Sequence, residues 1–262
     1  MAAQCVPPAN SSDAKLLAFY EDPIVFGTAT APQALALGRV SITGELTGIP
    51  SPGAAISHAT YCFSGIQGWT RLSPVLPRPR VAVGLPFGFA VEGSYLPPIT
   101  VANAQPNLGS LAVTYLHRLL GIVSVAGRFD GTIGTVKGPI TCPRSLLQQT
   151  DPTGECFGTK PSDDTFYPRS IGTDGTLVVQ PLGGRVTVYG GAGYTWMSPH
   201  FETGFTNADG VMNNTDIQIS LRRASVFGGV NVGIFSRLDA GAQVYSAPAD
   251  LTTWRLTARY RL

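Results

Sequence analysis

The residues that could do chemistry in this chain are first of all charged side chains on the polar side of stretches that alternate between apolar and polar residues. They are Arg39, Glu45, Arg80, Glu92, Arg128, Asp130, Arg185, Asp239, Arg255, Arg259 and Arg261. Charges of both signs that share one face can form a ladder of ion pairs. Such a ladder either stabilises a closed interior or defines a selective path for a solute, and a narrow interior favours the first role because side chains fill it.

Catalysis is the second kind of chemistry to consider. The chain has three histidines, His58, His117 and His200, and an acidic pair, Asp163 and Asp164. The sequence contains no GxSxG, HExxH or phosphate-loop motif. A catalytic site would need His200 and the two aspartates to converge around a cleft, and Asp-Asp in a polar loop is ordinary. The sequence therefore predicts neither an enzyme nor a cofactor.

The four cysteines, Cys5, Cys62, Cys142 and Cys156, are even in number and lack the CxxC spacing of metal sites. This pattern favours two disulfides in an oxidising compartment and no metal centre. The alternative is four buried free thiols.

Composition narrows the class of protein. The 262 residues are 44% hydrophobic and 13% charged, with a net charge of +2. Without a Lys/Arg cluster the chain is not expected to bind nucleic acid, which requires a basic surface. It also lacks the roughly 18 consecutive apolar residues of a membrane-spanning helix. The segment from Met1 to Gln4 has no apolar core of a signal peptide, so in an exported protein Met1 would stand in place of a removed leader.

The elements that position the charged residues are strands, and the last eleven residues show this best. Apolar Trp254, Leu256, Ala258, Tyr260 and Leu262 alternate with Thr253, Arg255, Thr257, Arg259 and Arg261. A period of two is the signature of a strand with one apolar and one polar face. Three arginines on that polar face suit a strand that lines a polar lumen while its other face meets lipid.

The same alternation predicts about ten strands. They are residues 38–47, 80–85, 89–95, 111–115, 123–133, 176–180, 185–196, 222–234, 238–245 and 252–262. Before them, Ser11 or Ser12 could cap a short helix over residues 13–20, which Pro23 would stop. Alternate connections are long, around residues 49–78, 97–107, 138–172 and 198–220, whereas those between are tight turns such as Pro86 to Gly88 and Leu182 to Gly184.

This combination resembles bacterial outer-membrane β-barrels, which have short periplasmic turns, longer external loops and an alternating final strand that ends on an apolar residue. The resemblance implies one closed antiparallel up-and-down transmembrane barrel over residues 38–262, of ten strands with a range of eight to twelve, in the outer membrane with its loops extracellular. The eleven charged residues would line its lumen. Five aromatic residues near predicted strand ends would lie at the lipid interfaces, although aromatic residues cap strands in any sheet: Tyr95, Tyr194, Trp196, Trp254 and Tyr260.

The barrel topology also implies how the cysteines pair. Cys142 and Cys156 share one external loop, and Cys62 lies in another. If Cys5 pairs with Cys62, the N-terminus must begin outside the barrel. Residues 1–37 would then form an N-terminal segment that passes inward through the lumen, with the short helix as a plug.

For function, the resemblance implies a passive channel or transporter, or a binder of a small solute, apolar ones included; a luminal plug is similar to that of the much longer outer-membrane fatty-acid transporters. The partners would be outer-membrane lipid and that solute. The alternative is a structural or adhesive barrel that contacts another macromolecule through disulfide-pinned loops such as residues 206–215. A rim protease of the omptin type is disfavoured, and a soluble β-sandwich would need a second sheet to cover its apolar face.

Overall fold

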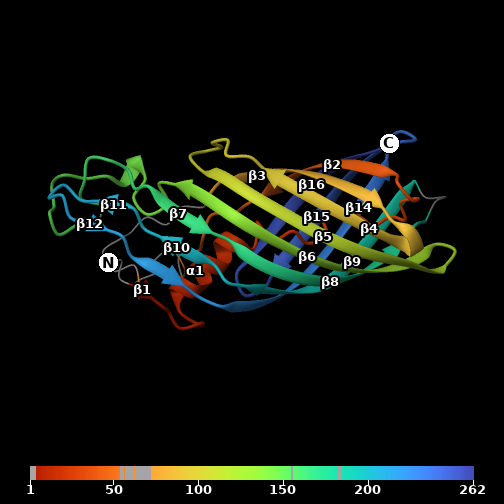
Figure 1. Cartoon of the computed structure of the whole chain (residues 1–262), viewed down its shortest axis with the longest axis horizontal. Coiled ribbons are helices and arrows are strands. Elements are labelled where there is room, and N and C mark those ends of the chain that lie inside the picture. The colour runs from red at the N-terminus through yellow and green to blue at the C-terminus, as the bar shows by residue number, and fades with distance from the viewer. Residues whose placement is uncertain (1–3, 54–55, 57–61, 63–71, 155, 182–184) are drawn as a thin grey trace.

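The strands of the computed structural model close into an antiparallel barrel, shown from the side in Figure 1. The structure describes residues 4–53, 56, 62, 72–154, 156–181 and 185–262. Within that part of the chain ten strands form the wall: β2 (Val40–Gly48), β3 (Val75–Gly84), β4 (Phe89–Leu96), β5 (Gln105–Leu120), β6 (Val123–Gly138), β8 (Arg169–Val179), β9 (Val186–Met197), β14 (Leu221–Gly233), β15 (Leu238–Ala247) and β16 (Leu251–Arg261). Pairing of β16 with β2 closes the ring. The predicted up-and-down barrel of ten strands is confirmed.

Several strands are longer than the sequence predicts. β3 begins at Val75 and not at Arg80, β5 extends over both sides of residues 111–115, and β8 begins at Arg169 and not at Thr176. The error at β3 has a physical cause, since Pro77 and Pro79 have no N–H and proline is normally excluded from strand interiors. The predicted turn at Leu182 to Gly184 lies outside the described residues.

The two faces of the wall have opposite chemistry. Side chains that point outward are apolar and exposed, for example Leu111 at 60%, Phe129 at 57% and Leu256 at 48%. The five aromatic residues of the predicted interface belts are exposed as well. Arginine, aspartate and glutamate are instead buried on the inner face. This arrangement is the reverse of a water-soluble barrel and is the arrangement of an outer-membrane barrel, whose solvent outside is hydrocarbon.

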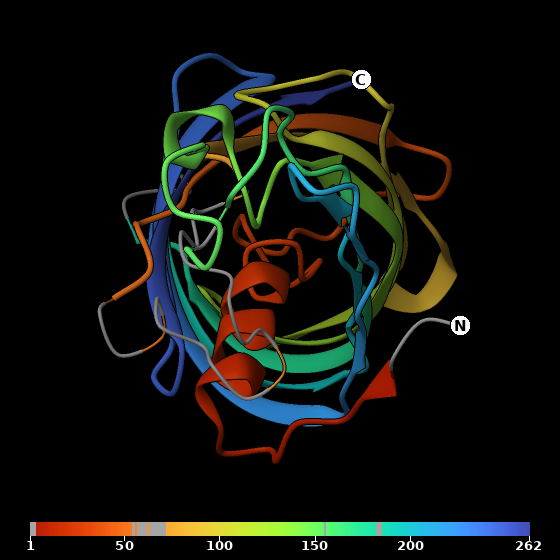
Figure 2. The same ribbon diagram turned by 90° about the vertical axis from the view of Figure 1, so that its left-hand side faces the viewer.

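The N-terminal segment occupies the inside of the barrel, as the view along the barrel axis shows (Figure 2). Helix α1 (Ser12–Glu21) begins after Ser11, whose hydroxyl accepts a hydrogen bond from the Ala14 N–H. Leu16, Leu17 and Ala18 are fully buried, so the helix is covered on nearly all sides. Residues 22–37 continue along the barrel axis to β2. Because β2 begins at the end of the barrel with the tight turns, the segment runs the length of the lumen.

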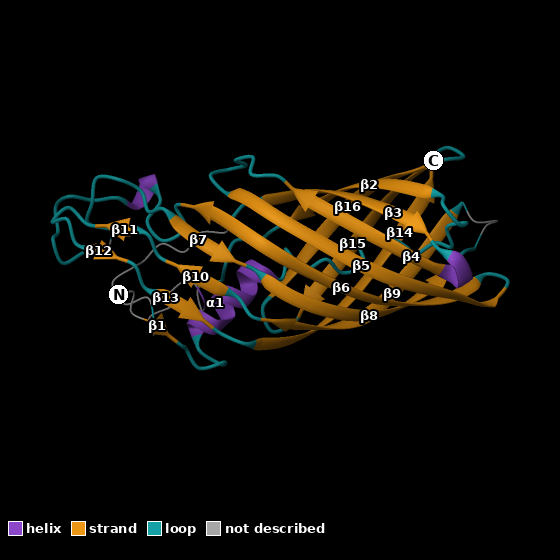
Figure 3. Cartoon of the chain, viewed as in Figure 1, coloured by secondary structure: helices purple, strands orange, loops and turns teal. Residues whose placement is uncertain are grey.

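Short strands extend the sheet beyond the barrel at the end with the long connections, which we call the long-loop end (Figure 3). β7 (Asp164–Tyr167), β10 (His200–Glu202), β13 (Asp216–Gln218) and β1 (Gln4–Cys5) pair in that order, and β11 (Phe205–Thr206) pairs with β12 (Met212–Asn213). Single helical turns, η1 (Pro86–Gly88) and η2 (Arg144–Leu146), lie in two of the connections. Strands of two to four residues have too little periodicity to be predicted from sequence.

Two disulfides fix this end of the molecule. Cys142 pairs with Cys156 inside the connection between β6 and β8, and Cys5 pairs with Cys62. The second disulfide holds the beginning of the N-terminal segment at the long-loop end. The segment is therefore tethered at both ends of the barrel, by a disulfide at one end and by continuation into β2 at the other.

Candidate functional site

The part of the N-terminal segment from Ile24 to Ala31 follows the turn at the end of α1, belongs to no sheet and is bound to the barrel wall through its main chain. We call it the luminal strand. Arg78 donates to the carbonyl oxygens of Ile24, at 2.6 Å, and of Val25, at 3.2 Å. Further along, wall side chains bind the carbonyls of Phe26, Gly27, Thr28, Ala29 and Ala31, the donors being Arg128, Arg80, Gln243, Tyr189 and Arg259. The luminal strand thus obtains from side chains the hydrogen bonds that a neighbouring strand would otherwise supply.

The donors of the luminal strand are satisfied in a similar way at two positions. The Thr28 N–H donates to Asp174, at 3.1 Å, and the Thr28 hydroxyl donates to the same carboxylate. The Ala31 N–H donates to the Asn231 side-chain oxygen, at 2.8 Å. Since these bonds are buried, losing one would leave an unsatisfied polar group inside the barrel.

Phe26 lies among three arginines of the wall. Its ring centroid is 4.2 Å from the guanidinium carbon of Arg80, 5.0 Å from that of Arg128 and 5.6 Å from that of Arg78. The negative face of an aromatic ring attracts a cation, and the attraction strengthens where water is excluded. Phe26 therefore anchors the luminal strand to three arginines of the wall.

Carboxylates compensate these arginines. Glu45 lies 2.5 Å from Arg80 and 3.6 Å from Arg255, and Glu92 bridges Arg80 and Arg128 at 3.2 and 2.5 Å. Nearer the tight turns, Asp239 contacts Arg259 at 3.1 Å and Arg261 at 2.9 Å. Opposite charges that are buried together avoid most of the cost that an isolated buried charge would carry.

The eleven predicted lumen residues occupy three kinds of position. Eight of them face the buried or half-buried interior: Glu45, Arg80, Glu92, Arg128, Asp130, Asp239, Arg255 and Arg259. Arg261 and Arg185 lie at the mouth with the tight turns, where both line a polar pocket with a volume of about 850 Å³. Arg39 precedes β2 and is exposed, with its guanidinium 3.5 Å from the carbonyl oxygen of Leu262.

Two charged luminal residues that bind the N-terminal segment are absent from the sequence prediction. Arg78 was missed because the flanking prolines hid its strand, although Leu76, Arg78 and Arg80 do alternate with Pro77 and Pro79. Asp174 was missed because its outward neighbours, Thr173 and Gly175, are weakly apolar and gave no strong alternation. The spacing of two from Arg80 could have identified Arg78.

The middle of the lumen is filled. The cavities lined by the luminal strand and its surroundings measure about 60 Å³ and about 10 Å³. The larger one lies between residues 28–35 and the side chains of Arg80, Glu92, Arg128 and Arg259. At this level of the barrel the space is too small for a solute larger than water.

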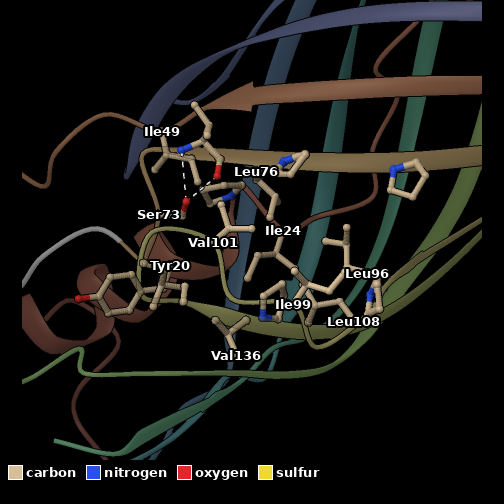
Figure 4. Close-up of a pocket in the computed structure, with 18 of the residues that line it drawn as sticks. Tyr20, Ile24, Ile49, Ser73, Leu76, Leu96, Ile99, Val101, Leu108 and Val136 are labelled. Carbon is tan, nitrogen blue, oxygen red and sulfur yellow. Dashed lines mark hydrogen bonds between the residues drawn. The ribbon is translucent and has the colours of Figure 1, made fainter. Parts of the chain in front are cut away.

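An apolar pocket lies at the long-loop end, between α1 and the wall formed by β2 to β6 (Figure 4). Its volume is about 300 Å³, the lower end of the range for ligand sites. Tyr20 and Ile24 of the N-terminal segment form one side, and Leu76, Leu108 and Val136 belong to the opposite wall. The hydroxyl of Ser73, which binds the carbonyl oxygen of Val75 at 2.6 Å, is the one side-chain polar group among residues 72–136 that line it, apart from the phenol of Tyr20 on the other side.

The residues that could have formed a protease site do not come together. The His200 ring contacts Asp216 at 2.6 Å and stacks on Tyr167, whose hydroxyl donates to Glu202. Burial and this hydrogen bond raise the pKa of the Tyr167 hydroxyl. Asp164 is instead buried.

The other candidates for chemistry are also accounted for. The Asp164 carboxylate accepts hydrogen bonds from Thr141, Ser162 and Gly204, and Asp163 is exposed. His117 is exposed on the outside of β5, and His58 lies outside the described residues. Among the residues that the structure describes, no group of three or more His, Cys, Asp or Glu is arranged to hold a metal ion. The same part of the chain contains no helix long and apolar enough to cross a membrane.

No protein-family model matches the chain, and no curated protein matches it in sequence. Solved outer-membrane structures are similar to it. Ail, the attachment invasion locus protein of Yersinia pestis, is 14% identical with a TM-score of 0.35, over 87% of this chain and all of that one. The translocator domain of the autotransporter NalP from Neisseria meningitidis is 11% identical with a TM-score of 0.46, over 88% and 91% of the two chains. KdgM porin is 10% identical with a TM-score of 0.34, over 84% and 98%. These similarities are weak, and nothing about a ligand follows from them.

Proposed function

We propose that this outer-membrane barrel is closed to ions and binds a small apolar molecule in the pocket beside α1, at its extracellular end. The observation that carries the proposal is the pocket itself, an apolar space of about 300 Å³ whose floor is the N-terminal segment. Burial of apolar surface is the main source of affinity that such a lining offers. Orientation would come from shape, because none of the described residues that line the pocket is charged.

We further propose that residues 1–37 act as a permanent plug. Seven carbonyl groups of the luminal strand are bound by wall side chains, and the Cys5–Cys62 disulfide tethers the segment outside. Removing the segment would leave the buried arginines without these partners, which is costly. The ion pairs of the lumen therefore support a closed structural interior better than they support a selective path.

Two measurements test the proposal. In planar bilayers the purified protein should show no single-channel conductance. In detergent it should bind N-phenyl-1-naphthylamine, an apolar dye that fluoresces when it leaves water, and Val136→Trp should abolish the binding because the indole occupies the pocket. Leu111→Trp is the matched control, since Leu111 is 60% exposed on the outer face. Steady conductance steps, or equal dye binding by both variants, would contradict the proposal.

The surface-contact alternative is favoured by one observation. Val211 and Met212, at the connection between β11 and β12, are 64% and 65% exposed at the extracellular end. Exposed apolar side chains on a disulfide-braced extension suit contact with another macromolecule. If that is the function, Val211→Ser with Met212→Ser should abolish attachment of cells that display the protein to a surface, and dye binding should be unaffected.

A further inference from the structure

The wall of the barrel beside the apolar pocket is not fully paired. β2 pairs with β3 along the whole of β3 as far as Val75, and β4 pairs with β5 from Phe89 to Leu96. Between β3 and β4 the ladder covers only the residues from Val81, opposite Gly93, to Gly84, opposite Ala90. Beyond this pair, towards the long-loop end, β3 continues from Val81 to Val75 and β4 from Gly93 to Leu96. Within the described residues no ladder joins these two stretches.

The direction of the backbone groups explains why the seam ends there. Gly84 exchanges hydrogen bonds with Gly38 and Arg39 on the β2 side, whereas Leu85 donates to Phe89 on the β4 side. Because backbone groups alternate along a strand, odd-numbered residues of β3 present their N–H and C=O to β4. Pro77 and Pro79 are odd-numbered, so the two next donors that would extend the ladder are missing.

The facing strand has the matching defect. Continuing the register of Val81 with Gly93 would place Pro79 opposite Tyr95 and Pro77 opposite Pro97. Pro97 also has no N–H, so a donor is missing on both sides of the same pair. The next odd residue, Val75, exchanges hydrogen bonds with the Ser73 hydroxyl within its own chain segment, its N–H donating and its carbonyl oxygen accepting. The sequence itself therefore keeps this seam from closing.

The open seam coincides with the pocket. Pro77, Pro79 and Pro97 are exposed on the outer side of the wall, whereas Tyr20, Ile24 and Leu108 are inside, and all six line the same space. The pocket thus extends from the surface of α1 through the wall to the outer face of the barrel. Figure 4 shows Leu76 of β3 and Ile24 of the N-terminal segment beside the same pocket.

We infer that the pocket is reached sideways from the outer leaflet, and that its occupant is a hydrocarbon chain of a membrane lipid; this rests on the proposed function of the pocket. The outer mouth is continuous with the lipid-facing surface, where Tyr95 and Ile99 are 57% and 63% exposed. An apolar chain can move from hydrocarbon into an apolar pocket without crossing water. Among the described residues that line the pocket, a polar ligand would meet no charged group, and a peptide strand that added to this edge would find acceptors but no donors at Pro77 and Pro79.

The test uses a phospholipid with a photoactivatable diazirine on its acyl chain, incorporated with the folded protein into phosphatidylcholine vesicles. After illumination, mass spectrometry of peptides should find label on inside residues such as Tyr20 and Ile24 as well as on outward Leu111. In Pro77→Val with Pro79→Val, restored N–H donors allow the seam to pair, and label inside should be lost while label at Leu111 remains. Pro98→Val is the matched control, because Pro98 is even-numbered, so that its backbone would face away from β3, and the change should leave both signals unchanged.

A second variant keeps the test decisive if the double proline variant does not fold. Ile99→Trp fills the outer mouth without changing a strand and should also abolish inside labelling; the folded state of each variant is checked by its heat-modifiable mobility in gels. A water-soluble aliphatic diazirine separates the two proposals. If it labels Tyr20 and the lipid does not, lateral access is wrong and the binding pocket remains. If neither probe labels the inside residues, both the binding pocket and the lateral access are wrong. If the lipid still labels the inside residues of the folded double proline variant and of folded Ile99→Trp, the lipid does not enter through this seam.

Discussion

The ring of Phe26 lies 4.2 Å from the guanidinium carbon of Arg80, so a residue of the N-terminal segment and a residue of the wall meet at the centre of the barrel. Two further arginines approach the same ring. This contact joins the segment that fills the lumen to the ion pairs of the wall. The plug and the charged ladder are therefore one structure and should respond together to mutation.

Phe26→Leu keeps an apolar side chain of similar burial but removes the aromatic face. We expect it to lower the free energy of unfolding by about 2 kcal/mol, the value for a desolvated cation–π contact. Urea unfolding in lipid vesicles, followed by tryptophan fluorescence, measures this. The control is Phe129→Leu, because Phe129 is outward and 57% exposed. An equal loss in both variants would contradict the role of the arginines.

Glu45→Gln removes one buried charge and leaves Arg80 and Arg255 without this carboxylate. Breaking one side of a buried ion pair costs about 3–5 kcal/mol, because the remaining charge is left uncompensated. We expect a loss in that range in the same unfolding assay. Asp209→Asn, a change of the same kind at an exposed position, should have no measurable effect. If Glu45→Gln left the free energy of unfolding unchanged, water would have to reach the lumen charges, and the barrel would be more open than the structure indicates.

Asp164→Ala should loosen the extracellular extension without opening the barrel. The carboxylate accepts from the Thr141 N–H at 2.6 Å, the Ser162 hydroxyl at 2.7 Å and the Gly204 N–H at 2.9 Å, and so joins three segments. Losing hydrogen bonds to a charged group costs about 2–3 kcal/mol. We expect faster trypsin cleavage at Arg144, which is exposed in the same connection close to Thr141, with the barrel itself still protected. Asp163→Ala is the control, because Asp163 is exposed. Trypsin should cleave this variant at the same rate as the unmodified protein.

Strand alternation predicted the barrel well because lipid imposes a simple rule: outward residues must be apolar, and a narrow interior can be polar. Val186 to Met197 and Leu251 to Arg261 follow this rule closely and were placed correctly. The rule fails where an outward residue is proline or glycine, and for that reason β3 was shortened and Arg78 missed. The open seam depends on which backbone edge a proline faces, and that becomes visible only when the register with β4 is known.

The pocket could not be predicted from the sequence for a different reason. Its lining combines Tyr20 and Ile24 of the N-terminal segment with Leu108 and Val136 of distant strands. None of these positions has an unusual residue type, since each is an ordinary apolar residue in its own segment. Only the depth at which α1 lies in the barrel decides that they face one another across an empty space.

Leu256→Arg tests whether hydrocarbon is the solvent of the outer face. Leu256 is 48% exposed in the middle of β16, between Leu46 of β2 and Ala242 of β15. An arginine on the lipid face near the bilayer midplane costs about 2–4 kcal/mol, whereas at a water-exposed position it costs almost nothing. We therefore expect a loss of that size for vesicle-embedded protein and none for Val211→Arg, because Val211 is 64% exposed in the extracellular extension. If Leu256→Arg were as stable as the unmodified protein in vesicles, the apolar row of the barrel would not face lipid, and the lateral route into the pocket would have no source of chains.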